Sequence, residues 1–445
     1  MQKNVVFIYS SAHGHLAKSL MISRFYQSKG YAVHYYIFGK NNLFETQTTV
    51  PITRMYARPF GINHETFSDA SPPIQLSWWR ELLTRHSGKH YRKRKAEIEQ
   101  LIAETDPTLI FLDEFCATDF IILYSHLTNR RCIVLAHCLP FVPGEYIPPF
   151  HLFEGPGEQA KALWHTYLRR KFRKQRTNTL KFLGRDHTGI VNSRFREQQI
   201  PAKHRPTFIL ERVPFFGALE KWYLVPHEID FEQQALPAGH RYMGSMLAVD
   251  RLETFSQHYQ LFLKFIANKP DSKLIFCALG TVISSTVNDP AVLVNFYTNL
   301  LQIAQANPHL FLLVQTDSRV SSMMKTKTLN CMFIQFAPQL DVLKRADVFI
   351  NHGGGNSTVE AIWTATPMLI VPPVNRWDYN GYAARVVHHQ LGLKANLTDS
   401  AAQLKLAIDE LLQNDLYKTK IEQMSQVFQT KYHPNYLHEL PMPLP

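Results

Sequence analysis

The sequence predicts an α/β protein with two Rossmann-like domains, each built on a parallel sheet, that face one another across a cleft. Short apolar runs alternate with segments of helical periodicity, a pattern typical of βαβ units. The alternation stops in a polar, turn-rich stretch at residues 227–245 and then restarts. A chain of 445 residues is also too long for one ordinary core.

The first domain is predicted from an opening strand, helix and second strand. VVFIYS at residues 5–10 is followed by a helical pattern at 16–30 and by YAVHYYIFG at 31–39. This order is that of a βαβ unit, which implies a parallel sheet. Further buried strands are expected at residues 108–114 and 132–138, and a fourth apolar run lies near residue 190.

The second domain is predicted from five more apolar runs with helical patterns between them. These strands are expected at residues 273–280, 311–316, 332–337, 347–354 and 368–373. We therefore expect a first domain, a linker, a second domain and a C-terminal tail that returns to the first domain, over residues 1–228, 229–250, 251–425 and 426–445.

Composition favours a globular protein of a reducing compartment. Hydrophobic residues make up 45% and charged residues 19%, and no apolar run reaches the roughly 18 residues that span a bilayer. The N-terminus enters a strand pattern without the apolar core of a signal peptide. The five cysteines are scattered without a Cys-x-x-Cys spacing, which argues against a disulfide framework or a zinc site. We expect a cytoplasmic protein.

The net charge of +12 is concentrated in one segment. Residues 161–185 hold nine lysines and arginines and no acid, so the rest of the chain carries about +3 (12 minus 9). Such local charge argues against a nucleic-acid-binding protein. The segment has the pattern of an interfacial helix on an anionic membrane, of a lid over an acceptor, or of a solvated helix packed on the domain. Its apolar residues fall near one helical face: Leu163, Trp164, Tyr167, Leu168 and Phe172.

A glycine-rich stretch, NHGGGNSTVEA at residues 351–361, follows a predicted strand of the second domain. Three glycines allow backbone amides to approach a ligand, and Asn356 or Ser357 would cap the next helix, whose N-terminus favours an anion. His352 would add a hydrogen bond or positive charge to a phosphate. No lysine follows the glycines, so this is not a Walker loop. A plain strand-to-helix turn is the alternative interpretation.

The segment around this stretch resembles the signature of nucleotide-sugar-dependent glycosyltransferases. This family includes UDP-glucosyltransferases and the macrolide and zeaxanthin glycosyltransferases, which share the two-domain fold called GT-B. Leu279-Gly280-Thr281, the RYMGS boundary and the AARVV tail at 383–387 are similar to further pieces of the family pattern. The positions that match the signature are Phe336, Pro338, Gln339, Leu343, His352, Gly354, Asn356, Ser357, Glu360 and Pro367.

The resemblance implies a donor site in the second domain and an acceptor site in the first. Phe336 would stack on the nucleobase with Gln339 beside it, and Glu360 would accept hydrogen bonds from the ribose. The diphosphate would be held by His352, Gly354, Asn356 and Ser357, with Thr281 facing it. The expected donor is a UDP-sugar, with UDP-glucose first. We expect no cofactor and no metal ion, because the sequence contains no Asp-x-Asp.

The resemblance also implies a catalytic base in the first domain. The family places a histidine in a Gly-His turn after the first strand, which matches Gly14-His15, although Lys18 replaces the proline that follows in the family. Asp113, at the end of a predicted strand, matches the partner that orients the imidazole. His13 and Glu114 are the alternatives for these two roles.

Together these residues imply an inverting glycosyltransferase that moves a hexose to a hydroxyl or similar nucleophile. The acceptor is expected to be small and lipophilic or aromatic, as in natural product glycosylation. Two alternatives stay open: a nucleotide-sugar epimerase with a similar two-domain fold, and a non-catalytic nucleotide-sugar-binding subunit. The presence of both His15 and Asp113 argues against the second.

The part of the signature that recognises the sugar departs from the family. Counting back from AARV places the family's Asp-Gln pair on Asp378 and Tyr379, whereas counting forward from Pro372 places it on Arg376 and Trp377. No glutamine is present, so the sugar stays open, and Asp378 is the best candidate for its hydroxyls. Ala365 replaces a usual glycine, which is harmless if the backbone φ there is negative.

Overall fold

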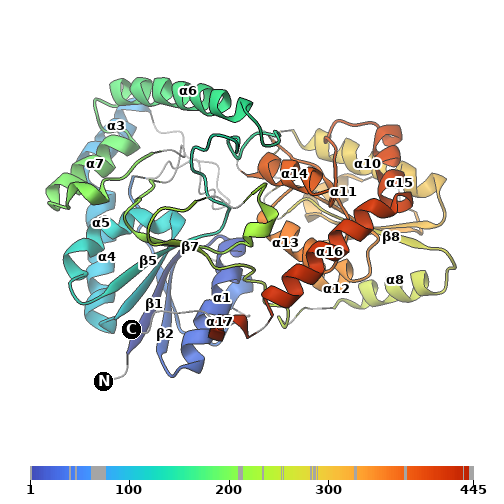
Figure 1. The fold of residues 1–445 in the computed structure, drawn as a ribbon, viewed down its shortest axis with the longest axis horizontal. Coiled ribbons are helices and arrows are strands. Elements are labelled where there is room, and N and C mark those ends of the chain that lie inside the picture. The colour runs from blue at the N-terminus through green and yellow to red at the C-terminus, as the bar shows by residue number, and fades with distance from the viewer. Residues whose placement is uncertain are drawn as a thin grey trace.

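The structure, a computed structural model, confirms an α/β protein with two separate parallel sheets, one in each half of the chain (Figure 1). None of the described helices combines the length and hydropathy needed to cross a bilayer. The described residues are 3–39, 42–45, 48–61, 77–208, 214–232, 235–251, 253, 255–280, 283, 287, 289–324, 328–374, 378–433 and 435–439.

The first half contains a seven-stranded sheet in the order β3-β2-β1-β4-β5-β6-β7. Its strands are β1 Asn4–Ser10, β2 Ala32–Phe38, β3 Ile52–Met55, β4 Leu109–Asp113, β5 Arg131–Ala136, β6 Glu220–Tyr223 and β7 His240–Tyr242. Its helices are α1 His13–Ser28, α2 Asn42–Glu45, α3 Trp78–Ser87, α4 Lys89–Thr105, α5 Phe120–Leu123, α6 Gln159–Lys181 and α7 His187–Glu197. The apolar run near residue 190 lies in α7, and β7 lies within residues 229–250, where we expected a linker.

The strands of this sheet are continuous apolar runs because helices cover both faces. Residues 5–9 of β1 are fully buried, and every strand pair in the sheet is parallel. β1 lies between β2 and β4, so the order of the strands runs outward from β1 on both sides. In parallel sheets, ligands bind at the carboxyl ends of strands where this reversal occurs.

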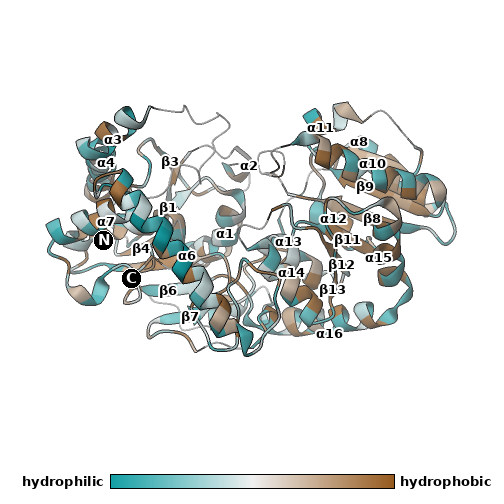
Figure 2. Ribbon diagram, turned by 90° about the horizontal axis from the view of Figure 1, so that it is seen from above, coloured by the Kyte–Doolittle hydropathy of each residue, from teal (hydrophilic) through white to brown (hydrophobic). Residues whose placement is uncertain are grey.

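The second half contains a six-stranded parallel sheet in the order β10-β9-β8-β11-β12-β13. Its strands are β8 Lys273–Ala278, β9 Leu310–Gln315, β10 Cys331–Ile334, β11 Val348–Asn351, β12 Met368–Ile370 and β13 Gly392–Lys394. Its helices are α8 Gln257–Ala267, α10 Pro290–Ala306, α11 Ser318–Met323, α12 Gln339–Leu343, α13 Gly355–Trp363, α14 Tyr379–His388 and α15 Ala401–Gln413. The same reversal occurs here between β8 and β11. Figure 2 shows hydrophobic residues gathered in this sheet and on the adjoining helices.

The C-terminal part of the chain ties the two halves together. Helix α16, Asp415–Lys431, leads to α17, Tyr436–Glu439, which lies beside α1 of the first half (Figure 1). The hydroxyl of Tyr436 donates to the carbonyl of Met243 at 2.9 Å and to that of Ser245 at 2.7 Å. In addition, Arg385 of α14 forms a buried ion pair with Asp230 at 2.6 Å. These contacts hold the two halves of the chain against each other.

The backbone at Ala365 does not have the negative φ that would make the loss of glycine harmless. Ala365 follows α13 and has φ of +54°, in the left-handed region. Its N–H still donates to the Ile362 carbonyl at 3.1 Å, which closes the end of the helix. An alanine in this conformation costs about 1–2 kcal/mol, because its Cβ crowds the following carbonyl.

Candidate active site

The imidazole of His15 and the carboxylate of Asp113 meet at the carboxyl edge of the first sheet. His15 lies in the first turn of α1, directly after β1, and Asp113 is the last residue of the neighbouring β4. Their Nδ1 and Oδ1 atoms are 2.9 Å apart. Of the residues expected for the catalytic pair, His15 and Asp113 are thus in direct contact.

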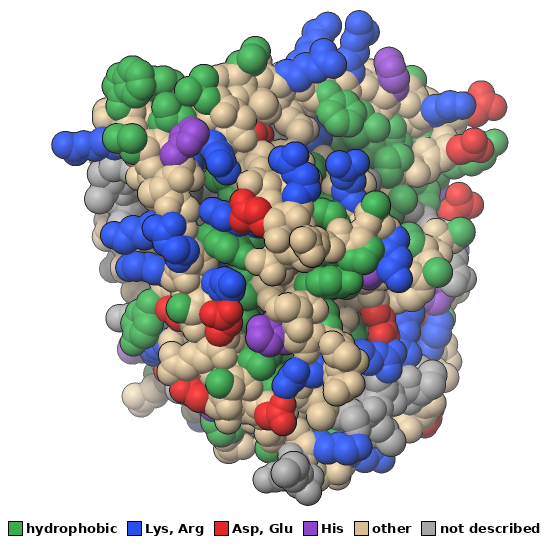
Figure 3. Space-filling model, turned by 90° about the vertical axis from the view of Figure 1, so that its left-hand side faces the viewer, with side chains coloured by type: hydrophobic (Ala, Val, Ile, Leu, Met, Phe, Trp, Pro, Cys, Tyr) green, Lys and Arg blue, Asp and Glu red, His purple; other side chains and the backbone are tan. Residues whose placement is uncertain are grey.

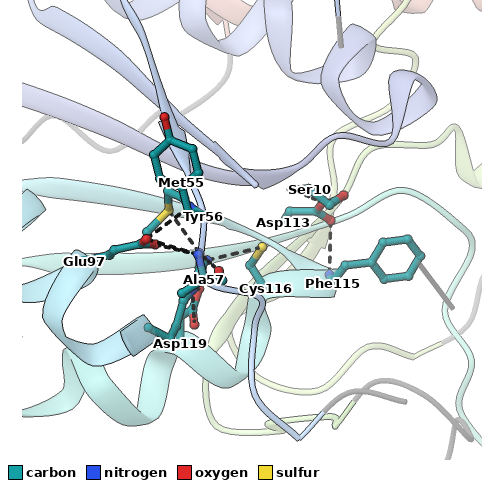
Figure 4. Close-up of polar contacts among 10 residues, drawn as sticks. Ser10, Met55, Tyr56, Ala57, Glu97, Asp113, Phe115, Cys116 and Asp119 are labelled. Atoms are coloured by element: carbon teal, nitrogen blue, oxygen red, sulfur yellow. Dashed lines mark hydrogen bonds and ion pairs between the residues drawn. The ribbon is translucent and has the colours of Figure 1, made fainter. Parts of the chain in front are cut away.

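Asp113 is held rigidly by its surroundings. It is fully buried, and its carboxylate also accepts the N–H and the hydroxyl of Ser10, at 3.0 and 2.5 Å, and the N–H of Phe115 at 3.1 Å (Figure 4). Burial alone raises the pKa of Asp113, but the attraction of His15 and these hydrogen bonds lower it overall. Asp113 is thus ionised at neutral pH.

A buried ion pair anchors the chain just beyond Asp113. The guanidinium of Arg94, in α4, contacts the carboxylate of Asp119 at 2.5 Å, and both side chains are fully buried. Arg94 also donates to the carbonyl of Ala57 at 2.9 Å. Ala57 and Asp119 are labelled in Figure 4. Removing one partner of such a pair leaves a buried charge alone, so this pair holds the turn after β4 in place.

The environment of His15 favours a proton on its ring. Burial alone lowers the pKa of His15, but the Asp113 carboxylate raises it, and the net pKa lies above the ordinary histidine value. Because Nδ1 contacts Asp113, Nε2 is the ring nitrogen on the side away from that carboxylate. The ring of Phe115 lies 4.5 Å from the imidazole, centroid to centroid, and limits its rotation.

Two buried neighbours of His15, His137 and Lys18, were not predicted as site residues. His137 follows β5, and its ring stacks on His15 with centroids 4.0 Å apart. Burial and the charges of His15 and Lys18 keep the pKa of His137 well below its usual range, so it is neutral. Lys18 donates to the His137 carbonyl at 2.7 Å, and burial lowers its pKa to about 8. The signal for His137 was a histidine directly after the strand next to β4, and the signal for Lys18 was its replacement of the family's proline.

In the part of the chain that the structure describes, one group of three side chains could hold a metal ion. His15, Asp113 and His137 offer ligand atoms that all lie within 4.8 Å of one another. Two imidazoles and a carboxylate are ligands that zinc accepts. However, the Asp113 oxygen closest to His15 already takes part in a hydrogen bond, and the two rings stack at 21° rather than converge on one point. The arrangement fits proton transfer better.

In the second domain, the glycine-rich loop connects β11 to α13. Gly354, with extended φ and ψ, is the N-cap of α13, and no side chain caps the helix. The expectation that Asn356 or Ser357 caps it was wrong, because both lie inside the first turn. The first-turn amides therefore have no side-chain partner, which suits an anion at the positive end of the helix.

The loop is shaped around the ring of His352. A Cβ on Gly280, after β8, would lie 2.7 Å from Cε1 of His352, and one on Gly354 would lie 2.5 Å from Nε2. Burial lowers the pKa of His352 to about 4, so its imidazole is neutral. Of the two contributions expected of His352, a hydrogen bond or a positive charge, the neutral ring leaves the hydrogen bond.

Glu360 is already engaged by two side chains of its own domain. Gln339 donates to Oε2 at 2.7 Å, and Arg251 contacts Oε1 at 2.5 Å. Gln339 also lies 3.5 Å from the hydroxyl of Ser357. The sequence did not indicate Arg251, which is 109 residues away in the chain. A ribose would have to share this carboxylate with Arg251 and Gln339.

The remaining expected donor residues lie around this loop. Phe336 follows β10 and is 67% exposed, so it is not a core aromatic. Asp378 is the N-cap of α14, and burial raises its pKa to about 6. Tyr379 packs edge-on against the His352 ring, 5.1 Å away. Thr281, and the alternative pair Arg376 and Trp377, lie outside the described residues.

The two half-sites touch directly. The side-chain amide of Asn356, in the glycine-rich loop, donates to the carbonyl of Gly14 at 3.0 Å. A Cβ on Gly14 would lie 3.0 Å from the Asn356 amide nitrogen, so a larger residue here would have to displace that side chain. The residue before His15 is thus in contact with the loop that is suited to an anion.

Comparison with known proteins finds a family match over the second half of the chain. Residues 215–434 match the family described as UDP-glucoronosyl and UDP-glucosyl transferase. The chain is 29% identical over 159 residues to the uncharacterized UDP-glucosyltransferase YdhE of Bacillus subtilis, covering 36% of this chain and 38% of that protein. It is 27% identical over 195 residues to the zeaxanthin glucosyltransferase of Pantoea ananas, covering 43% and 41%. The matches thus span about two fifths of these relatives.

The fold is also that of solved glycosyltransferases. The structure of the glycotransferase of kitacinnamycin superimposes with a TM-score of 0.65 and 15% identity, covering 98% of this chain and 97% of that one. At this identity the likeness concerns the fold alone. It confirms the GT-B architecture, and the family match confirms the resemblance found around the glycine-rich stretch.

Proposed function

Because residues 215–434 match the UDP-glucoronosyl and UDP-glucosyl transferase family, we propose that this chain is an inverting glycosyltransferase. It moves a hexose from a nucleoside diphosphate sugar to a hydroxyl, or a similar nucleophile, of a small molecule. The observation that carries the proposal is the pairing of His15 with Asp113 at 2.9 Å, in contact with a loop suited to a diphosphate.

The acceptor step uses the first domain. Nε2 of His15 takes the proton from the acceptor hydroxyl as its oxygen forms a bond to the anomeric carbon of the sugar. The ionised Asp113 stabilises the imidazolium that results. The bond between the anomeric carbon and the phosphate oxygen breaks on the opposite face, so the configuration inverts and the electron pair leaves with the diphosphate.

The donor is held by the second domain. The first-turn amides of α13, the hydroxyl of Ser357 and the side chains of Asn356 and His352 bind the diphosphate, whose charge is stabilised by the helix N-terminus. Thr281, which lies outside the described residues, is the further residue that the resemblance assigns to the diphosphate. Phe336, being exposed, offers a ring on which a base can stack. Gln339 and Glu360 contact the nucleoside, and Asp378 and Tyr379 contact the sugar. A UDP-sugar, UDP-glucose first, is the expected donor.

The proposal includes no cofactor and no metal ion. Backbone amides and the helix dipole supply the stabilisation of the leaving group, so a chelator is expected to leave turnover unchanged. The expected acceptor is small and lipophilic or aromatic. The five cysteines are free thiols, which favours action in the cytoplasm.

The alternatives gain no support from the geometry. An imidazole held by a buried carboxylate at the domain seam suits proton removal from an acceptor, which a non-catalytic subunit does not need. An epimerase has no acceptor to deprotonate.

The test is the stereochemistry of transfer. The full chain is incubated with UDP-glucose, and in parallel with other UDP- and TDP-sugars, and a panel of phenolic and aliphatic alcohols. Release of the nucleotide is measured, and the product is analysed by NMR. We expect a β-glucoside from the α-linked donor. A product of retained configuration, or a sugar nucleotide merely epimerised without transfer, would contradict the proposal.

A further inference from the structure

Helix α6 has an inner face that is used for packing. The indole of Trp164 is buried, donates to the Ile147 carbonyl at 2.8 Å, and packs against Phe141. Tyr167 packs against Phe141 and His151. Part of the apolar face expected from the sequence therefore holds the helix on its domain rather than facing outward.

The outer face of α6 is cationic with apolar side chains among the charges. Arg169, Arg173 and Arg176 are exposed at a spacing of four and three residues, which places them on one side of the helix. Leu180 continues the row and is 78% exposed, and Phe172 beside it is 55% exposed. No acidic residue occurs between residues 159 and 185 to neutralise this charge.

Helix α3 extends this surface at the C-terminal end of α6. The indole of Trp78 donates to the Lys181 carbonyl at 3.1 Å, and the guanidinium of Arg85 lies 4.0 Å above the Phe182 ring. These contacts bring three more exposed hydrophobic side chains to the same corner, each about two-thirds exposed: Trp79, Leu83 and Leu183.

Together these residues form what we call the α3–α6 surface: Trp79, Leu83, Phe172, Leu180 and Leu183 with Arg169, Arg173 and Arg176. Figure 3 faces this end of the molecule and shows hydrophobic side chains next to lysines and arginines along its upper part. Soluble proteins rarely keep several large apolar side chains exposed together without a partner.

We propose that the α3–α6 surface binds an anionic lipid membrane, with α6 lying in the plane of the interface. Tryptophan, phenylalanine and leucine side chains enter the boundary between headgroups and acyl chains, while arginines bind the phosphates. The two kinds of side chain point to a lipid surface rather than a nucleic acid. A nucleic acid would satisfy the arginines but would leave the exposed leucines in water.

The α3–α6 surface lies on the first domain, which is the half proposed to bind the acceptor. The inner face of α6 packs on residues 141–151, and the carbonyl of His151 accepts a bond from Asn380 of α14 at 3.4 Å. A lipophilic acceptor dissolved in the bilayer would thus be presented on the side of the first domain. Membrane binding itself does not depend on the transfer reaction.

The test is sedimentation of the full chain with vesicles of phosphatidylcholine, with or without phosphatidylserine. We expect binding to the anionic vesicles that weakens as salt is added. Arg169→Glu/Arg173→Glu/Arg176→Glu is expected to weaken binding at least about tenfold, given the contribution of each cation near an anionic surface. Trp79→Ser/Leu180→Ser, which keeps every charge, is expected to weaken it about tenfold as well.

The matched control has the same change of charge on the second domain: Lys264→Glu/Lys269→Glu/Arg319→Glu. It should bind as the wild type does, and all variants should keep far-UV circular dichroism and turnover of a water-soluble acceptor. His15→Ala should also bind vesicles normally, which separates this proposal from the catalytic one. Equal binding to neutral vesicles, equal loss in the control, or preference for RNA over anionic vesicles would overturn the proposal.

Discussion

The two half-sites differ in the groups that determine their electrostatics. In the first domain, the site consists of titratable side chains, and Asp113 is fully buried and held by several hydrogen bonds. In the second domain, the site consists of backbone amides, glycines and a neutral His352. The comparison indicates that the first half-site suits proton transfer, whereas the glycine-rich loop of the second suits an anion without using a charged side chain.

The comparison predicts that first-domain variants change the chemical step and second-domain variants change donor binding. The largest effect after loss of His15 itself is expected from Asp113→Asn. Turnover should fall by about 10²–10⁴-fold, because the amide no longer stabilises the imidazolium, while UDP binding measured by calorimetry stays the same. Asp250→Asn, at an exposed carboxylate, is the control and should be silent.

The same variant should shift the pH profile. The pKa of His15 is raised in the wild type, and the base must be neutral, so turnover rises with pH as the pH passes this raised value. Asp113→Asn removes the carboxylate that raises the pKa. The acid limb of its residual activity should therefore move to lower pH. A limb that moves upward or stays in place would show that Asp113 does not control His15.

A smaller effect, in the other half-site, is expected from Gly280→Ala. Gly280 has φ of +87°, and a Cβ would lie 2.7 Å from the His352 ring. The added methyl group should displace the imidazole and weaken UDP binding about tenfold, without moving the acid limb of turnover. Gly155→Ala, where a Cβ meets nothing within 4 Å, is the matched control. Unchanged UDP binding in Gly280→Ala would separate His352 from the donor.

The smallest effect concerns stability alone. Ala365→Gly should stabilise the protein by up to about 1 kcal/mol, because glycine adopts the φ of +54° without steric cost. Ala407→Gly, inside α15, should instead destabilise it by about 1 kcal/mol. Thermal unfolding measures both, and turnover should not change in either variant. A loss of stability in Ala365→Gly would mean that the turn tolerates alanine without strain.

The sequence predicted most of the fold because its signals are local. Alternating apolar runs and helical patterns identified both sheets, and the parallel arrangement placed His15 and Asp113 at the same edge. By contrast, the pairing of Arg251 with Glu360 and the stacking of His137 on His15 join residues about 110 to 120 positions apart. No local pattern indicates such contacts.

Reasoning from residue types also failed at the start of α13, where the backbone conformation decides which residue caps the helix. Asn356 and Ser357 are good N-cap residues, but Gly354 takes the cap position with an extended backbone. The sequence left open whether His352 would offer a hydrogen bond or a positive charge, and burial against glycines keeps its ring neutral. The approach of neighbouring backbone to this loop, which decides both points, is not visible in residue types.

The most direct test of the central claim compares turnover and donor binding in His15→Ala. Nucleotide release in the presence of acceptor and calorimetric binding of UDP are measured for this variant and the wild type. We predict that turnover falls about 10²–10⁴-fold while the Kd for UDP changes by less than about twofold. Full turnover in His15→Ala, or a parallel loss of UDP binding, would contradict the separation of proton transfer and anion binding between the two domains.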